Sequence, residues 1–511
     1  MFEDVKDKYN LIFITVFSII LATYYINFNN NIGLFCSDVY VYLLNSLYYT
    51  GNPILQTQNI YLSPLICFLT SLIFRAGFVS KTAIYIVTGA FAICGNIGFY
   101  LLLKKYFSPL LSLCGCIIYV SLPLYLIWFS NGTLDIPAVS ILIWIALFTV
   151  KAVDENPKYF TPLIILIVLG IFTRYTILLC LPAFIMYYIF KKGFKISKID
   201  LKYIIIGLII SSFLAFITVS YITSLSDTNT FGAENQISEG ISGVQGSEID
   251  PAYNTDITYY LTNIPNFISS TNNYFDGNPV LKSPTPLSVA VILILIIGLG
   301  LWIISHKRSF KKSDIYPLIF FTAGIISFSH VSAVITTILV LIAIYLMAKD
   351  SPNKNQYFFL AWIFSNIIFY SYYNIKVNRY FLPVIPPIIY FLLLSVESIE
   401  KKVKPNILPI ALIVVFIIQA FVFPLTFEPT YEYKAVEDIS DYANDNNLTN
   451  IGVYNIRPYN WWLGNNITGI ASDNISTIKD SNVSYYISNT KLDNFSEVKN
   501  FEKLHLYNIS V

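Results

Sequence analysis

Long apolar stretches alternate with short polar segments along residues 1–424. A stretch of about 17–25 apolar residues is long enough to cross a bilayer as a helix, and Lys and Arg in short connections mark the cytoplasmic side. Because Lys6 and Lys8 precede the first stretch, we expect the N-terminus to be cytoplasmic. Single spans are predicted at residues 10–27, 82–103, 108–129, 136–150, 202–224, 286–304, 357–373, 380–396 and 406–424.

Two further apolar segments, 160–190 and 315–347, begin and end beside lysines. Both ends of each segment are then cytoplasmic, so each segment has to cross the membrane an even number of times. We predict two short tilted spans in each, with turns near Arg174 and near His330, which gives thirteen spans and an extracytoplasmic C-terminus. Arg174 then lies on the outer face against the charge rule, so it needs a partner, and an anion would suit it.

The polar segments predicted outside the membrane include two long loops. The first loop, residues 28–80, contains an amphipathic helix from Asp38 to Tyr49 and an apolar stretch, 61–74, that we expect to lie in the membrane interface. The second loop, residues 225–285, contains seven acidic residues and no Lys or Arg up to residue 281.

The chain therefore divides into a transmembrane domain, residues 1–424, and a polar tail, residues 425–511. Alternation of apolar and polar residues in the tail indicates a small soluble extracytoplasmic α/β domain. Its helix is predicted at 434–444 and its strands at 451–455, 483–487 and 503–509.

The composition agrees with a polytopic α-helical membrane protein. Hydrophobic residues make up 55% of the chain and charged residues 12%, against about 25% charged residues in soluble domains. The first apolar stretch has no small-residue cleavage site after it, so we interpret it as a retained span of an integral plasma-membrane protein. A net charge of +2 without a basic run or a Gly-rich phosphate loop does not indicate nucleic-acid binding. The six cysteines show no zinc spacing, and a Cys36–Cys67 disulfide is the alternative to two buried thiols.

Two acids and several cations are predicted at the outer ends of the spans. Asp38 is the only carboxylate between Asp7 and Asp135, and a lone acid beside a span is a candidate site residue. Asp135 is the second outer acid. The predicted outer cations are Arg75, Lys81, Arg174, Lys376 and Arg379. Each acid has an alternative role as a helix cap, and the arginines have an alternative role in snorkelling to lipid headgroups.

One carboxylate beside several cations at a membrane surface suits sugar transfer from a lipid-phosphate donor. The carboxylate can remove the proton of an acceptor hydroxyl as a general base. The cations can stabilise the charge that grows on the phosphate leaving group. A transporter or flippase of a lipid-linked sugar is the alternative function, but it would more often carry charges deep inside its spans.

Five segments that carry these residues resemble the GT-C glycosyltransferases, above all the branch of dolichyl-phosphate-mannose protein mannosyltransferases and lipid A aminoarabinose transferases. They follow the family order over residues 1–400. The segments are Asp38-x-Tyr40, Ser63-Pro64-Leu65, Leu134-Asp135-Ile136-Pro137, Phe172-Thr173-Arg174-Tyr175-Thr176 and Asn378-Arg379-Tyr380-Phe381-Leu382-Pro383-Val384-Ile385-Pro386.

The resemblance implies an inverting transfer of a sugar from a polyprenyl (dolichyl) phosphate to an acceptor protein, glycan or lipid outside the cytoplasm. It implies Asp38 as the base and Asp135 as a second acid of the site. Phosphate-binding candidates are Arg174, Arg379, Lys376, Arg75 and Tyr40. Many members pair two acids in the first loop, whereas Ser37 and Val39 flank a single acid here, which weakens the case for a divalent cation held by Asp38 and Asp135. Members usually carry Lys where this chain has Arg174, and the two cations bind phosphate differently.

An oligosaccharyltransferase-like enzyme is the related alternative. Asn460-Trp461-Trp462-Leu463-Gly464 in the tail is similar to the Trp-Trp-Asp-Tyr-Gly motif of that family. The segment lacks the acidic residue that would bind an acceptor. The other interpretation is an aromatic edge that packs on the membrane side of a small domain.

Overall fold

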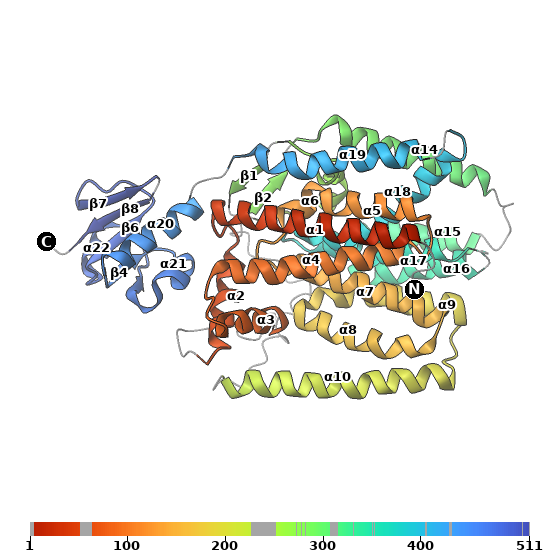
Figure 1. Cartoon of the computed structure of the whole chain (residues 1–511), viewed down its shortest axis with the longest axis horizontal. Helices are drawn as coiled ribbons and strands as arrows, with labels where there is room; N and C mark the ends of the chain where they lie inside the picture. The colour runs from red at the N-terminus through yellow and green to blue at the C-terminus, as the bar shows by residue number, and fades with distance from the viewer. Residues whose placement is uncertain are drawn as a thin grey trace.

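The structure is a computed structural model of the whole chain, and it consists of a helical bundle and a small C-terminal domain (Figure 1). Eight of the described helices are long and apolar enough to cross a membrane. The predicted fold class is therefore confirmed, while the number of thirteen spans stays a prediction. The described residues are 5–51, 64–225, 252–271, 273–276, 278–281, 283–306, 315–330, 332–349, 351, 353–403, 406–428, 432–502 and 504–509.

The first half of the bundle follows the apolar pattern closely. Prolines at helix starts fit the predicted breaks, because proline lacks the N–H that an interior position would need. Pro123, for example, starts a new short helix within the predicted span 108–129. The helices are α1 (Val5–Ile32), α2 (Ser37–Tyr48), α3 (Pro64–Arg75), α4 (Lys81–Leu103), α5 (Pro109–Ser121), α6 (Pro123–Ile127), α7 (Asp135–Asp154) and α10 (Lys198–Leu225).

The two segments with lysines at both ends are helical hairpins, as predicted. Residues 160–190 form α8 (Phe160–Thr173) and α9 (Leu181–Lys192), joined through the 3-10 helix η2 (Tyr175–Cys180). Residues 315–347 form α15 (Ile315–His330) and α16 (Ala333–Lys349), which pack against each other.

The remaining elements of the bundle follow α10 in the sequence. The described part of the second loop contains two short helices and a β-hairpin, and its β1 pairs with β3 at the start of the tail. The first residues after the predicted boundary at residue 424 thus pair with the second loop. The elements are α12 (Tyr259–Thr262), α13 (Ile264–Ile268), β1 (Asn273–Asp276), β2 (Asn278–Leu281), α14 (Pro286–Ser305), α17 (Asn355–Tyr372), η4 (Asn378–Val384), α18 (Ile385–Glu400), α19 (Ile407–Val422), η5 (Phe423–Thr426) and β3 (Phe427–Glu428).

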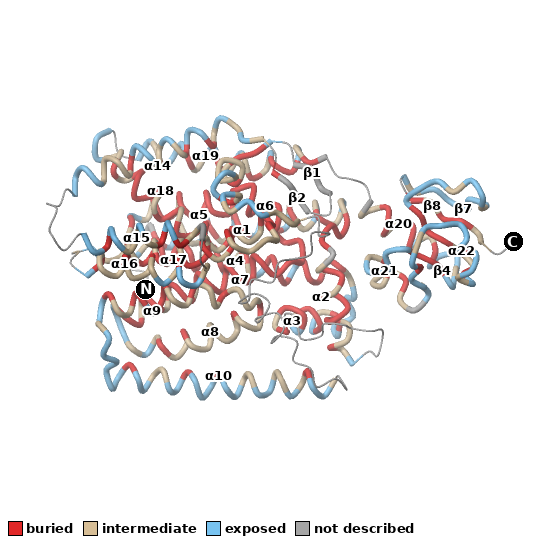
Figure 2. Tube along the Cα trace, turned by 180° about the vertical axis from the view of Figure 1, so that it is seen from behind, coloured by how far each residue is buried: buried red, intermediate tan, exposed pale blue. Residues whose placement is uncertain are grey.

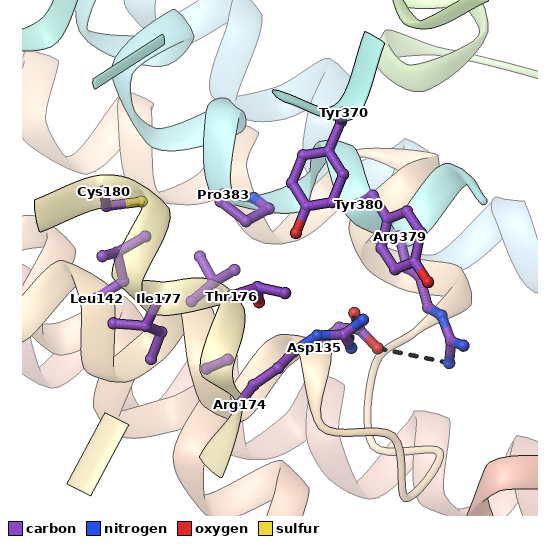
Figure 3. Close-up of a pocket in the computed structure, with 12 residues that line it drawn as sticks. Asp135, Leu142, Arg174, Thr176, Ile177, Cys180, Tyr370, Arg379, Tyr380 and Pro383 are labelled. Atoms are coloured by element: carbon purple, nitrogen blue, oxygen red, sulfur yellow. Dashed lines mark hydrogen bonds and ion pairs between the residues drawn. The ribbon is translucent and has the colours of Figure 1, made fainter. Parts of the chain in front are cut away.

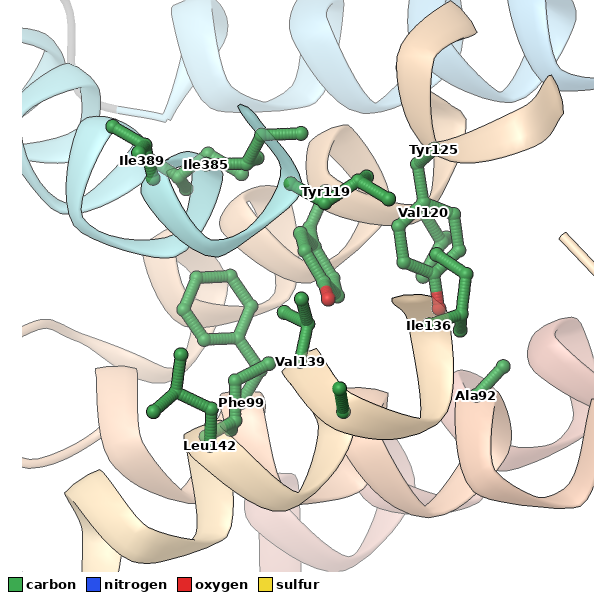
Figure 4. Packing of buried hydrophobic residues seen from close by; sticks show 14 of the residues in the cluster. Ala92, Phe99, Tyr119, Val120, Tyr125, Ile136, Val139, Leu142, Ile385 and Ile389 are labelled. Atoms are coloured by element: carbon green, nitrogen blue, oxygen red, sulfur yellow. The ribbon is translucent and has the colours of Figure 1, made fainter. Parts of the chain in front are cut away.

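The core of the bundle lies around α4, α5, α7 and α18 (Figure 2). Aromatic and branched side chains interlock there, with Phe99 and Tyr119 ring centroids 5.0 Å apart (Figure 4). The outer helix α10 instead exposes apolar side chains such as Phe213 and Phe216. Because large exposed apolar faces mark contact with other apolar surfaces, we assign this face of α10 to lipid.

The tail is a small α/β domain with one mixed sheet. The predicted helix and strands are present as α20 (Glu432–Asp445), β4 (Ile451–Val453), β6 (Tyr485–Ser488) and β8 (Leu504–Asn508). The sheet has the order β5-β4-β6-β8-β7, in which β5 (Ile467–Gly469) and β7 (Ser496–Phe501) are edge strands that the sequence did not reveal. Two helices complete the domain, α21 (Ile456–Leu463) and α22 (Ile475–Asp480).

The tail packs on the first loop, at the end of the bundle that carries α2 (Figure 1). Lys81 forms a buried ion pair with Glu437 of α20, and Phe74 stacks on Trp461 at 5.8 Å. Gly33, with φ +87°, allows this approach because an added Cβ would lie 2.7 Å from the backbone of Tyr433. Trp461 therefore packs on the membrane side of the domain, which is the structural alternative to an acceptor-binding motif.

Candidate functional site

Asp38 lies in the first turn of α2. Its side chain faces η4, the 3-10 helix between α17 and α18, rather than its own helix. The N-cap position is taken by Cys36, and no side chain caps this helix. Instead, Arg379 Nη2 donates a hydrogen bond of 2.8 Å to Asp38 Oδ2. The side chain of Asp38 is 35% exposed, so it remains accessible to a substrate. The capping alternative for Asp38 is therefore wrong.

Asp135 begins α7 and is also no cap, because Leu134 holds the N-cap position without a side-chain hydrogen bond. Its carboxylate is buried and forms an ion pair with Arg174. Arg174 lies between α8 and η2 in extended backbone, which turns its side chain toward α7. The predicted need of Arg174 for an anionic partner is thus confirmed, and Asp135 is the partner.

Arg379 links the two acids. Its Nη1 lies 3.8 Å from Asp135 Oδ2, while its Nη2 holds Asp38. The order in space is Asp38–Arg379–Asp135–Arg174. Two carboxylates and two guanidinium groups alternate, and their formal charges cancel. We call these four residues the acid–arginine cluster. Four segments that are distant in the sequence meet here: the first turns of α2 and α7, the residue before η2, and the start of η4.

A pocket opens beside the acid–arginine cluster (Figure 3). Asp135, Arg174 and Arg379 form its polar end, and the hydroxyl oxygens of Tyr370 and Tyr380 point toward the same space. The other end is mostly apolar. It is lined by Ala138, Val139, Leu142, Thr176, Ile177, Cys180 and Pro383. The lining therefore combines a polar, arginine-bearing end with an apolar end, the same two characters as an anionic head on an apolar body.

Aromatic rings hold the two guanidinium groups in place. The ring of Tyr380 lies 5.4 Å from Arg174 Cζ and 6.0 Å from Arg379 Cζ. Trp128 covers Arg379 at 5.4 Å. Such contacts favour a cation over the ring face and keep it desolvated. Sequence reasoning missed Trp128 and Tyr370, because apolar spans contain many aromatic residues; only the position of Tyr380 next to Arg379 gave a signal.

Three predicted phosphate-binding residues lie elsewhere. Arg75 donates to Tyr49 O at 2.7 Å at the end of α2, and Tyr40 donates to Leu34 O at 3.1 Å. Lys376 Nζ is buried and donates to three carbonyl oxygens at the end of α17. Burial lowers the pKa of Lys376 to about 8, against the attraction of Asp256. The pocket lining includes none of these three among the described residues, so they do not support the phosphate-binding prediction.

The two acids do not suit a shared divalent cation. The guanidinium of Arg379 lies between Asp38 and Asp135, where a bridging cation would have to bind. In the described part of the chain, no three His, Cys, Asp or Glu residues gather as metal ligands. Cys36 and Cys67 are both buried and neither forms a disulfide, so the alternative of a disulfide between them is wrong.

Burial and charge act in opposite directions on Asp38. Burial alone would raise the pKa of its carboxyl group. The charge and hydrogen bond of Arg379 outweigh burial, with help from Arg174 and Arg457, and hold the pKa below its ordinary value. Asp38 is therefore ionised at neutral pH, as a general base has to be.

Comparisons with known proteins agree with the fold. Residues 61–221, which include Asp135 and Arg174, match the sequence model of the dolichyl-phosphate-mannose-protein mannosyltransferase family. A search of curated proteins finds no match.

Two solved structures are similar over nearly all of the chain. ArnT from Cupriavidus metallidurans bound to undecaprenyl phosphate has a TM-score of 0.54 at 10% identity, covering 96% of this chain and 97% of ArnT. The apo oligosaccharyltransferase of Archaeoglobus fulgidus has a TM-score of 0.49 at 11% identity, covering 94% of this chain and 69% of that enzyme. At these identities, the likeness to ArnT shows a common fold.

Proposed function

We propose that this chain, a membrane glycosyltransferase of the GT-C type, transfers a sugar from a polyprenyl-phosphate donor to an acceptor outside the cytoplasm. One observation carries this proposal: three members of the acid–arginine cluster, Asp135, Arg174 and Arg379, form the polar end of a pocket whose other end is apolar, and Asp38 is bound to Arg379 beside it. The donor has the same two-part character, an anionic phosphate on an apolar chain. The acceptor is a hydroxyl of a protein, glycan or lipid, and the transferred sugar is a hexose or pentose.

The phosphate of the donor binds between Arg174 and Arg379. Planar guanidinium groups bind phosphate oxygens through paired hydrogen bonds. The first isoprene units follow the apolar lining formed by Val139, Leu142 and Ile177. The sugar then extends toward α2, which carries Asp38.

Asp38 acts as the base in an inverting displacement. It accepts the proton of the acceptor hydroxyl, whose oxygen attacks the anomeric carbon from the face opposite the phosphate. The bond from the anomeric carbon to the phosphate oxygen breaks, and polyprenyl phosphate leaves with its electron pair. Negative charge on the phosphate grows in this step, and the two preorganised arginines stabilise it. Asp135 holds both arginines in position.

The orientation of the chain follows from its lysines. The cytoplasmic side carries the Lys-rich connections, so the acid–arginine cluster and the tail domain face outside. The tail lies against the first loop beside α2, at the side from which an acceptor reaches Asp38. The enzyme is thus proposed as a multi-pass plasma-membrane protein with a cytoplasmic N-terminus.

The direct test uses purified protein in proteoliposomes with a set of radiolabelled polyprenyl-phosphate sugars and envelope extract as acceptor. The expected result is sugar transfer together with release of polyprenyl phosphate. A flippase would move the labelled lipid across the bilayer without breaking the bond. That outcome would contradict the proposal.

The acid side of the pH profile is a further prediction. Because the pKa of Asp38 is lowered, kcat/KM for transfer should stay constant as the pH falls through the ordinary carboxyl range near about pH 4 and should decline only below it. In an Arg379→Lys variant, the bond to Asp38 weakens while burial remains, so the decline should begin at higher pH. An unchanged profile in this variant would show that Arg379 does not control the base.

A further inference from the structure

The backbone turn before Arg379 is held from outside the pocket. Lys376 N–H donates to Ala252 O at 2.9 Å, and Asn254 N–H donates to Asn374 O at 2.8 Å. Tyr253 and Ile375 form the antiparallel bridge between these two bonds. A segment more than a hundred residues earlier in the sequence thus pairs with the turn as a short ribbon.

Side chains of the same segment contact residues before and after Arg379. Tyr259 Oη donates to Asn378 Oδ1 at 2.7 Å, directly before Arg379. Tyr260 Oη donates to Val377 O at 3.2 Å. Behind Arg379, the ring of Phe381 lies 5.0 Å from that of Phe267. The bonds and ring contacts therefore hold the turn on both sides of Arg379.

Lys376 fixes the other end of the same turn. Its Nζ donates to the carbonyl oxygens of Tyr370, Ser371 and Tyr373 at 2.6–2.9 Å. The last carbonyls of a helix lack partners inside the helix, and a cation at this end also complements the helix dipole. The buried ammonium of Lys376 thus ties the turn to the end of α17.

We infer that residues 252–268 clamp the turn that carries Arg379, and that Tyr259 and Lys376 are positioning residues for the phosphate-binding arginine. None of the described residues 252–268 lines the pocket, so the clamp acts only through the turn. Accurate placement matters because one guanidinium has to contact both Asp38 and Asp135. The inference depends on the proposed function only for the identity of the ligand, polyprenyl phosphate.

The test compares Tyr259→Phe with Tyr253→Phe, a matched control in the same segment whose substitution keeps the backbone bridge. Binding of undecaprenyl phosphate to the full chain in nanodiscs is measured by intrinsic fluorescence. Loss of one hydrogen bond should raise the dissociation constant about fivefold in Tyr259→Phe and leave the control unchanged. Lys376→Met should raise it further, because three hydrogen bonds are lost.

Two combined variants separate positioning from general stability. In an Arg379→Ala background, Tyr259→Phe should have no further effect on binding, because the arginine it positions is absent. Asn378→Ala and Tyr259→Phe should be non-additive, because they remove the same bond. A fivefold loss that persists without Arg379 would overturn the inference and assign Tyr259 a merely structural role.

Hydrogen exchange gives a readout that needs no lipid. Peptides covering residues 373–381 should exchange faster in Tyr259→Phe than in the wild-type chain, while peptides of the tail stay unchanged. Unchanged exchange of the turn overturns the clamp. If the wild-type chain does not bind undecaprenyl phosphate while the turn still loosens, the proposed function fails and the clamp stands.

Discussion

Replacing Asp38 with asparagine is expected to lower kcat for sugar transfer by about 10²–10⁴-fold, the usual contribution of a general base. The amide keeps the size of the side chain and can still contact Arg379, but it cannot accept the hydroxyl proton. Binding of polyprenyl phosphate should persist, because the phosphate is assigned to Arg174 and Arg379. Transfer assays and binding of undecaprenyl phosphate to the same preparation measure the two effects separately.

Asp438→Asn is a suitable control for this variant. Asp438 is a partly exposed acid of the tail that pairs with Lys434, away from the acid–arginine cluster. It should retain wild-type transfer. Full activity of Asp38→Asn in a folded protein would remove Asp38 from the role of base, whatever the donor is.

Substitution of Arg379 by alanine is expected to weaken binding of polyprenyl phosphate about 10–100-fold, since hydrogen bonds to charged groups contribute about 1.5–3 kcal/mol. It should also slow transfer, because the leaving phosphate loses a donor that stabilises its growing charge. Asp135 keeps its partner Arg174 in this variant, and Asp38 is partly exposed, so neither acid is left buried and alone.

Arg174 calls for a milder substitution. Alanine there would leave the buried carboxylate of Asp135 without its nearest cation, and an uncompensated buried charge destabilises strongly. Arg174→Lys keeps the charge and should weaken phosphate binding less than Arg379→Ala. Lys401→Ala, an exposed cation beyond the end of α18, serves as the control. Wild-type lipid affinity in Arg379→Ala would contradict the assigned phosphate site.

Charge and hydropathy along the chain were sufficient to predict that Asp38, Asp135, Arg174 and Arg379 lie at the same end of the bundle. The lysines on both sides of residues 160–190 predicted that Arg174 lies where the charge rule disfavours a cation and therefore has an anionic partner. That partner is Asp135. The hairpins α8–α9 and α15–α16 and the helix and three strands of the tail followed from the same kind of pattern.

Distances within the plane of the membrane could not be predicted in this way. Knowing on which side of the membrane a residue lies does not give its position within the membrane plane. Arg75 and Lys376 therefore looked as suitable for binding phosphate as Arg379, although they bind backbone carbonyls elsewhere. The contact of Arg379 with Asp38 joins residues 341 positions apart, and only tertiary packing brings them together. The edge strand β7 was missed because its residues are mostly exposed and polar and lack an alternating pattern.

A structure of the protein in nanodiscs with undecaprenyl phosphate, determined by electron cryomicroscopy, tests the central claim most directly. The account predicts the phosphate within hydrogen-bond distance of Arg174 and Arg379, with the first isoprene units along Val139 and Leu142. Asp38 should then face the free side of the phosphate, where the sugar would be attached. A phosphate bound away from both arginines, with their ion pairs to Asp135 and Asp38 intact, would contradict it.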